Sequence, residues 1–297
     1  MQLPFVTLDV FTSKRFEGNP VAIVKVPTGT NISQLQKQHV AKEFNLSETV
    51  FLHEQTDKDL GEGAFRVDIF TAIAEVPFAG HPVTGTANYL LHYLKDSKSK
   101  ALITKAGRIP FHVTDNGVQL QVAHNVHIHS QPFASQPFGH YPVVSIVKGM
   151  TFILAQLPTL EDLSHQTQNL LGPENTYTSH EALDPTWQAG IVTTFYYVDL
   201  GLSSEHSPTP TRLIRTRMFG SREDPATGSA SSALCCYLTL TQKPKANRAT
   251  YHLTQGVEMN RESHIFIEVT LTDDGNGIKE VLLSGTAVKV MEGSVEM

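Results

Sequence analysis

Short apolar runs rich in β-branched and aromatic residues recur along the chain, separated by Gly, Pro, Asn or Asp. Runs of this kind, bounded by turn residues, are typical of β-strands. They predict strands at Phe5–Val10, Val21–Val26, Val118–Val122, Thr193–Val198 and Ile265–Leu271.

Three segments show helical spacing of apolar residues instead: Ser33–Phe44, Thr84–Lys95 and Thr227–Leu240. The first begins with a serine, a residue that is common at helix starts, and the other two are rich in Ala and Leu. Because strands and helices do not alternate strictly, the pattern favours an α+β fold over a doubly wound sheet.

The two halves of the chain carry related segments. His81–Ala87 matches Asp224–Ala230, with Pro, Thr, Gly, a hydroxyl residue and Ala in register at an offset of 143 residues. An Arg-x-x-Ile/Met-Phe strand precedes each copy, at Arg66–Phe70 and Arg215–Phe219, and an apolar helix pattern follows it. Pro-x-Thr-Gly consists of common turn residues, but the flanking elements agree as well, so we predict a duplication.

The duplication divides the chain into two similar domains. We expect a first domain over residues 1–123, joined by some C-terminal residues, and a second over 142–284. The Pro- and His-bearing stretch 124–141 is then the connection between them.

Charge and composition exclude several function classes. The chain of 297 residues has 23 Lys+Arg and 29 Asp+Glu, a formal net charge of −6, and no basic run. A nucleic-acid or anionic-membrane partner is therefore not expected. We find no apolar stretch of the roughly 18 residues that a membrane span needs, no signal-peptide pattern and no nucleotide-binding glycine motif.

The only two cysteines, Cys235 and Cys236, are adjacent and lie in a predicted apolar helix. Adjacent cysteines seldom pair with each other, so a disulfide framework is excluded and a reducing, cytoplasmic setting is expected. A Cys-based zinc site is excluded by the missing CxxC spacing.

Several titratable residues are candidates for chemistry. His81 and Asp224 open the two repeat segments, and Glu48 lies between a predicted helix and a predicted strand. Histidine titrates near neutral pH and a carboxylate can orient it or carry a proton. Each of these residues alone is equally compatible with a turn or a helix end. Two loops that open helices would offer unpaired amides to a small anionic metabolite.

A histidine run gives the one hint of a metal site. His127 and His129 fall on one face of a strand, where two imidazoles could begin such a site. No Asp, Glu or Cys is close in sequence, so we expect an exposed polar strand face and no metal.

Taken together, the motifs resemble the PhzF family of phenazine biosynthesis-like isomerases. The matching blocks run in order along nearly the whole chain: Asp9–Phe11, Phe16-x-Gly18-Asn19-Pro20, Leu46-Ser47-Glu48-Thr49, Glu75-x-Pro77-Phe78-Ala79-Gly80-His81-Pro82, Arg217–Phe219, Glu223–Ala230, Gln255-Gly256 and Gly285-x-Ala287-Val288 to Glu292-Gly293.

The resemblance implies a diaminopimelate-epimerase-like fold, with two pseudo-symmetric domains. Each domain would be a curled, mostly antiparallel sheet around a central helix, and the active site would lie between them. It also implies a cofactor-independent isomerase that moves a C–H proton on a small anionic carboxylate. A homodimer is an open alternative for the oligomeric state.

The resemblance further assigns residue roles. Glu48 is the expected acid and base, and His81 and Asp224 orient and polarise. The expected substrate-binding residues are Asn19, Gly80, Gly228 and Ser229. Two-thiol epimerases of the same fold carry facing cysteines where this chain has Ala79 and Thr227, so a racemase of that type is disfavoured.

Two features keep the function open at this point. Only Gly220–Glu223 separate Phe219 from Asp224, and Ala72 and Asn260 stand where the family has Pro and Gly, which leaves the substrate undefined. A non-catalytic metabolite-binding or protein-interaction module on the same fold is the alternative, because one fold can host unrelated functions.

Overall fold

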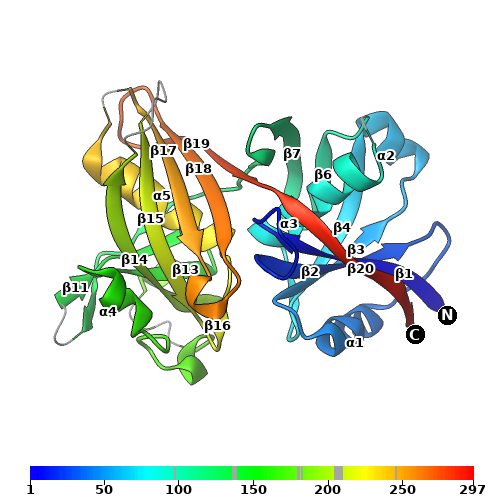
Figure 1. Cartoon of the computed structure of the whole chain (residues 1–297), viewed down its shortest axis with the longest axis horizontal. Coiled ribbons are helices and arrows are strands. Elements are labelled where there is room, and N and C mark those ends of the chain that lie inside the picture. Colours follow the sequence, from blue (N-terminus) through cyan, green and yellow to red (C-terminus); the bar gives the residue numbers. More distant parts are fainter. Residues whose placement is uncertain (97, 136–138, 179–180, 182, 204–209, 245) are drawn as a thin grey trace. The chain divides into compact units, whose positions relative to one another are not determined.

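The computed structural model of the chain describes all residues except 97, 136–138, 179–180, 182, 204–209 and 245. It divides into two compact units, Met1–Gln121 with Ser284–Met297, and Val122–Leu283. Each unit is a mostly antiparallel sheet packed around one buried helix, as can be followed in Figure 1. The predicted α+β class is therefore confirmed.

The sheet of the first unit is continuous through eight pairings. β1 pairs antiparallel with β20 and β2, β2 lies parallel to β3, and β3 pairs antiparallel with β4. β4 then pairs antiparallel with β5 and parallel with β6, which leads on to β7 and β8. The strands are β1 (Gln2–Val10), β2 (Asn19–Val26), β3 (Glu48–His53), β4 (Ala64–Phe70), β5 (Glu75–Val76), β6 (Ala101–Thr104), β7 (Gly107–Thr114), β8 (Gly117–Gln121) and β20 (Ala287–Glu296).

Three α-helices accompany this sheet: α1 (Gln34–Phe44), α2 (Asp57–Glu62) and α3 (Gly80–Asn88), which continues as a π-helix, η1 (Tyr89–Tyr93). Every residue of α3 is buried, and the helix contacts β1, β2, β3, β6, β8 and β20. Its two buried threonines bond to the helix itself: the Thr84 hydroxyl donates to the Gly80 carbonyl at 2.9 Å and the Thr86 hydroxyl to the Pro82 carbonyl at 2.8 Å. A helix can be buried on all sides when its polar groups are satisfied in this way.

Gly85 permits a close approach of α3 to the sheet. A Cβ at this position would lie 2.8 Å from Val10 Cγ2 and 2.9 Å from Val21 Cγ1. Branched valine side chains have little freedom to move aside. The helix therefore needs a glycine where it crosses β1 and β2.

The second unit repeats this arrangement. β12 pairs antiparallel with β9 and β13, β13 lies parallel to β14, and β15 pairs antiparallel with β14 and β16 and parallel with β17, which leads to β18. The strands are β9 (His127–Ile128), β10 (Phe133–Ser135), β11 (Gly139–Tyr141), β12 (Val143–Val147), β13 (Met150–Gln156), β14 (Ile191–Leu202), β15 (Thr211–Phe219), β16 (Glu223–Asp224), β17 (Arg248–Gln255), β18 (Ser263–Leu271) and β19 (Ile278–Gly285), whose last two residues belong to the first unit.

The central helix of the second unit is α5 (Gly228–Gln242), which contacts β12, β13, β17 and β18. Cys235 and Cys236 are fully buried in it, and burial raises the pKa of both thiols, as expected for inert core cysteines. The remaining helices are short: α4 (Leu160–Ser164), η2 (Pro173–Asn175), η3 (Pro185–Trp187) and η4 (Val257–Met259).

The two units pair the strands around their central helices in the same order, but the register differs from the one that the motifs suggest. α3 starts at Gly80 and α5 at Gly228, so the helix starts are 148 residues apart rather than 143. Thr84 and Gly85 lie inside α3, whereas Thr227 and Gly228 open α5. The structural counterpart of His81 is therefore Ser229. The predicted alignment of His81 with Asp224 in the two repeat segments is wrong.

The predicted strands and helices lie where the structure has strands and helices, with shifted ends. α1 begins after Ser33, whose hydroxyl accepts from the Gln36 amide, and Gln36 returns a hydrogen bond to the backbone of Ser33. The stretch 124–141, expected as a connection, belongs to the second unit, because β9 pairs with β12. Within the described part of the chain, no helix combines the length and apolarity of a membrane span.

The close approach at Gly85 gives a testable consequence. Gly85→Ala should lower the free energy of unfolding by about 1–2 kcal/mol, because overpacking outweighs the gain in helix propensity. Gly61→Ala in α2 is the matched control, since its Cβ would meet nothing within 4 Å. That control should be neutral or stabilise by ~0.5–1 kcal/mol. Urea denaturation measures both, and equal effects would contradict the packing assigned to Gly85.

Candidate active site

Glu48 is the first residue of β3, directly after the end of α1. Asn45 ends that helix in the left-handed conformation, with its N–H bonded to the Ala41 carbonyl at 3.1 Å. β3 then runs parallel to β2, with Glu48 opposite Val21. The tight helix end and the parallel pairing together place the Glu48 carboxylate at the start of an interior strand.

The Glu48 carboxylate contacts the imidazole of His81. Glu48 Oε2 lies 3.1 Å from His81 Nδ1, and the two side chains are 18% and 4% exposed. His81 is the second residue of α3, so the buried helix carries its ring to the beginning of β3. The structure thus brings together two residues that are 33 positions apart in the sequence.

The surroundings of His81 decide its charge. Burial lowers the pKa of the imidazole to about 3, although a hydrogen bond to the backbone carbonyl of Pro20 raises this pKa in part. The ring is therefore neutral near pH 7. The hydrogen bond to the Pro20 carbonyl uses Nδ1–H, because Nε2 has no partner in the described part of the chain, so Nε2 of the neutral ring is an acceptor. That Nε2 atom is buried and has no hydrogen-bond partner among the residues described.

Asn19 lies beside this pair. It is the first residue of β2, is completely buried, and accepts a long hydrogen bond of 3.5 Å from the hydroxyl of Ser47, the residue before Glu48. Asn19 and Glu48 thus stand at the starts of neighbouring parallel strands. An amide in this position has the donors and acceptors that a polar ligand requires.

Both central helices begin without a capping side chain. Gly80 opens α3 after Ala79, and Gly228 opens α5 after Thr227, and neither preceding residue makes a side-chain cap hydrogen bond. Amides in the first turn of a helix have no partner within the helix and favour anions. Ser229, the second residue of α5, is nearly buried. Gly80, Gly228 and Ser229 therefore occupy positions suited to a carboxylate.

The Thr227 hydroxyl is used elsewhere, because it donates to Asp224 Oδ2 at 2.6 Å. The fully buried Gln255 reinforces this link. Its Nε2 donates to the Asp224 carbonyl at 2.8 Å and to Thr227 Oγ1 at 3.1 Å, and its Oε1 accepts from the Thr227 amide at 3.1 Å. The Gln255 side chain thus makes three hydrogen bonds that hold the segment of Asp224 and Thr227 in place.

An ion pair fixes the preceding turn between β15 and β16. The nearly buried Arg217 guanidinium binds both carboxylate oxygens of Glu223, at 2.7 and 2.9 Å. It also donates to the carbonyls of Leu163 and Ser164 and lies over the ring of Phe219. Bidentate pairing of this kind holds the turn in one geometry.

The predicted site residues are distributed over both units. Glu48, His81, Asn19 and Gly80 lie in the first unit, and Asp224, Gly228 and Ser229 lie in the second. Their functional roles remain predictions. Gln255 and Arg217 matched the family motifs, but no role could be assigned to them from the sequence. Thr227 follows Asp224 at the spacing of a local turn, but Gln255 is 31 positions from Asp224 and has no local signal.

Comparison with known proteins places the chain among related sequences. A family model described as phenazine biosynthesis-like protein matches residues 8–293. The trans-2,3-dihydro-3-hydroxyanthranilate isomerase of Pseudomonas aeruginosa is 29% identical over 295 residues, which span 97% of this chain and 98% of that protein. The resemblance read from the motifs is therefore confirmed.

Solved structures share the fold. The Bacillus anthracis phenazine biosynthesis protein of the PhzF family matches with a TM-score of 0.75 at 20% identity, over 100% of both chains. A hydroxyproline epimerase from Agrobacterium vitis matches with a TM-score of 0.61 at 13% identity, over 99% of this chain and 92% of that one. At these identities the likeness shows the fold alone, and it confirms the predicted fold type.

The neutral state of His81 can be tested by NMR. Its Cε1–H resonance, assigned with a His81→Gln variant, should keep its neutral chemical shift from about pH 8 to pH 5. In the unfolded chain the ring takes up a proton near pH ~6.5, so His81 should lower the stability of the fold as the pH falls from ~6.5 toward 3. A titration midpoint of about 6 or above would instead mean that Glu48 holds the ring as an imidazolium.

Proposed function

The chain belongs to the family of phenazine biosynthesis-like proteins, and from this membership we propose that it is an isomerase. The proposed reaction moves a proton from one carbon of a small anionic carboxylate to another and uses no cofactor. The observation that supports it most directly is the buried contact between Glu48 and His81. A partly buried carboxylate beside a buried, neutral imidazole suits acid and base catalysis at carbon.

Glu48 is the acid and base of this proposal. Removal of a C–H proton requires a base beside the carbon and support for the negative charge that develops. Glu48 takes the proton and returns it to a second carbon of the same molecule. His81 lies against this carboxylate, with Nδ1 at 3.1 Å from Glu48 Oε2, and its Nε2 is left to accept a hydrogen bond from a hydroxyl or amino group of the substrate.

Substrate binding falls to the residues at the helix and strand starts. The first-turn amides at Gly80, Gly228 and Ser229 are suited to the substrate carboxylate, because anions are stabilised at helix N-termini. Asn19 adds a buried amide beside Ser47. Asp224, held by Thr227 and Gln255, orients or polarises the substrate.

The substrate of the Pseudomonas aeruginosa relative, trans-2,3-dihydro-3-hydroxyanthranilate, is a carboxylate of the proposed class. It is therefore the first compound to offer to this chain. We also propose a reducing compartment such as the cytoplasm, because both cysteines are buried in α5 as free thiols.

The assay is proton NMR of this compound with the protein in heavy water. We expect rearrangement with deuterium incorporation, and a loss of about 10²–10⁴-fold in turnover for Glu48→Gln. Glu54→Gln is the matched control, since Glu54 follows the same strand and its carboxylate accepts from the Thr28 amide at 2.6 Å. Turnover of the control should stay within about twofold of the parent chain.

Two results would count against the proposal. Undiminished turnover in Glu48→Gln would remove Glu48 from the chemistry. A compound that binds and is recovered without exchange of its C–H protons would favour a metabolite-binding module on the same fold.

A further inference from the structure

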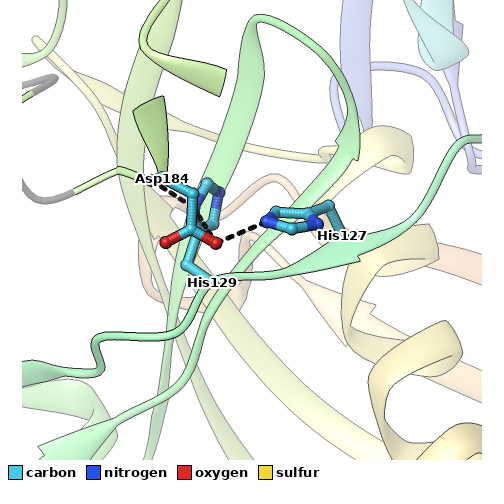
Figure 2. A group of neighbouring side chains, drawn as sticks. All are labelled: His127, His129 and Asp184. Carbon is cyan, nitrogen blue, oxygen red and sulfur yellow. Dashed lines mark hydrogen bonds and ion pairs between the residues drawn. The ribbon is translucent and has the colours of Figure 1, made fainter. Parts of the chain in front are cut away.

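Two histidines and a distant aspartate meet in the second unit. His127 lies in β9, His129 follows two residues later, and Asp184 comes from a segment 57 positions beyond His127. Figure 2 shows the three side chains together, with the Asp184 carboxylate beside both rings. Their ligand atoms lie within 4.8 Å of one another, and among the described residues this is the only such group. The fold thus supplies the carboxylate that is missing near the histidines in sequence.

Local structure explains why the three groups converge. His127 and His129 project from the same side of an extended chain, and their rings meet edge to face with centroids 4.8 Å apart. Asp184 precedes Pro185 at the start of η3, where its side chain makes no cap hydrogen bond. The carboxylate is therefore directed to the histidines rather than used by its own helix.

The spacing of the donor atoms fits a small metal ion. Asp184 Oδ2 lies 2.7 Å from His127 Nε2 and 3.9 Å from His129 Nδ1. Two ligands on a tetrahedral ion with bonds of about 2.0–2.1 Å are separated by about 3.3 Å, and the observed distances bracket this value. Small shifts of the side chains would place all three donors on one ion.

The tautomer of His129 is already the one that a metal requires. Its Nδ1 accepts from the Asp184 amide at 3.1 Å, so this nitrogen is unprotonated, and its Nε2 lies 2.9 Å from the Ser145 hydroxyl. An ion bound to Nδ1 would replace the hydrogen bond from the Asp184 amide. Ser145 in turn bonds to Thr151 at 2.7 Å. Metal-binding histidines commonly donate their second N–H to such a partner, which fixes the ring orientation.

The other two ligands have supporting contacts as well. The Ser130 hydroxyl donates to Asp184 Oδ1 at 2.7 Å, and the Ser130 amide donates to Oδ1 at 3.4 Å and to Oδ2 at 3.3 Å, which orients the carboxylate with Oδ2 toward His127. The His127 ring stacks on Trp187 with centroids 4.5 Å apart and an interplanar angle of 6°. An oriented carboxylate and a ring held by stacking reduce the ordering cost of binding an ion.

We propose that His127, His129 and Asp184 bind one divalent transition-metal ion of the zinc type, with water in the remaining position. Two imidazoles with one carboxylate suit such ions, whereas Ca²⁺ and Mg²⁺ prefer oxygen ligands. The ion would tie the segment of Asp184 and Trp187 to β9 and stabilise the second unit. It has no part in the proton transfer assigned to Glu48.

Trp187 makes the site directly observable, because it is the only tryptophan in the chain. Chain without an affinity tag, treated with chelator, is titrated with Zn²⁺ and separately with Co²⁺. We expect one equivalent of Zn²⁺ after dialysis, with a Kd of about 10 µM or below. Co²⁺ should quench the Trp187 fluorescence at the same stoichiometry, and Zn²⁺ should raise the melting temperature.

Variants locate the ion. His127→Gln and Asp184→Asn should each weaken Zn²⁺ binding by about tenfold or more, and Asp184→Asn keeps an oxygen that can accept from Ser130. His252→Gln is the matched control, since His252 and His264 form a second close histidine pair, at 3.1 Å. It should leave Zn²⁺ binding unchanged. Circular dichroism verifies the fold of each variant.

Either of two outcomes would overturn the proposal. Failure of the parent chain to retain Zn²⁺ or to show quenching by Co²⁺ would mean that the three residues form only a hydrogen-bonded link. Binding that survives both His127→Gln and Asp184→Asn would place the ion elsewhere.

Discussion

The proton transfer proposed for this chain depends on one contact, between the Glu48 carboxylate and the His81 imidazole at 3.1 Å. The contact exists because α3 is buried on all sides by its sheet, so the second residue of the helix is held away from water. The same burial keeps His81 neutral by lowering its pKa to about 3. The packing of α3 therefore determines the protonation state of His81. Gly85 contributes to this packing by allowing α3 to approach β1 and β2.

The duplicated scaffold carries different chemistry in its two halves. Each unit has a helix that starts at a glycine without a side-chain cap. At the second helical position the first unit has His81 and the second has Ser229. The hydroxyl of Thr227 bonds to Asp224 instead of capping α5. The same type of central helix is therefore combined with a titratable pair in one unit and a hydrogen-bonded network in the other.

The sequence was informative where the signal is local and failed where it is not. The start of α1 could be predicted because Ser33 and Gln36 form a capping box within one turn. The predicted repeat register was wrong because the two Thr-Gly pairs have different structural roles. Gly85 allows close packing inside α3, whereas Thr227-Gly228 forms the start of α5. The contacts of Gln255 with Asp224 and of Asp184 with His127 join residues far apart in sequence, so only the fold reveals them. The family motifs, by contrast, led to Glu48 and His81 before their contact was seen.

The most direct test of the central contact is a double-mutant cycle on kcat/KM for trans-2,3-dihydro-3-hydroxyanthranilate, with Glu48→Gln, His81→Gln and the two combined. Residues that act as one unit show strongly non-additive losses. If Glu48 and His81 form the proton-transfer unit, the double variant should be no slower than Glu48→Gln alone. Losses that simply multiply would show that the two side chains act independently and would contradict the role assigned to their contact.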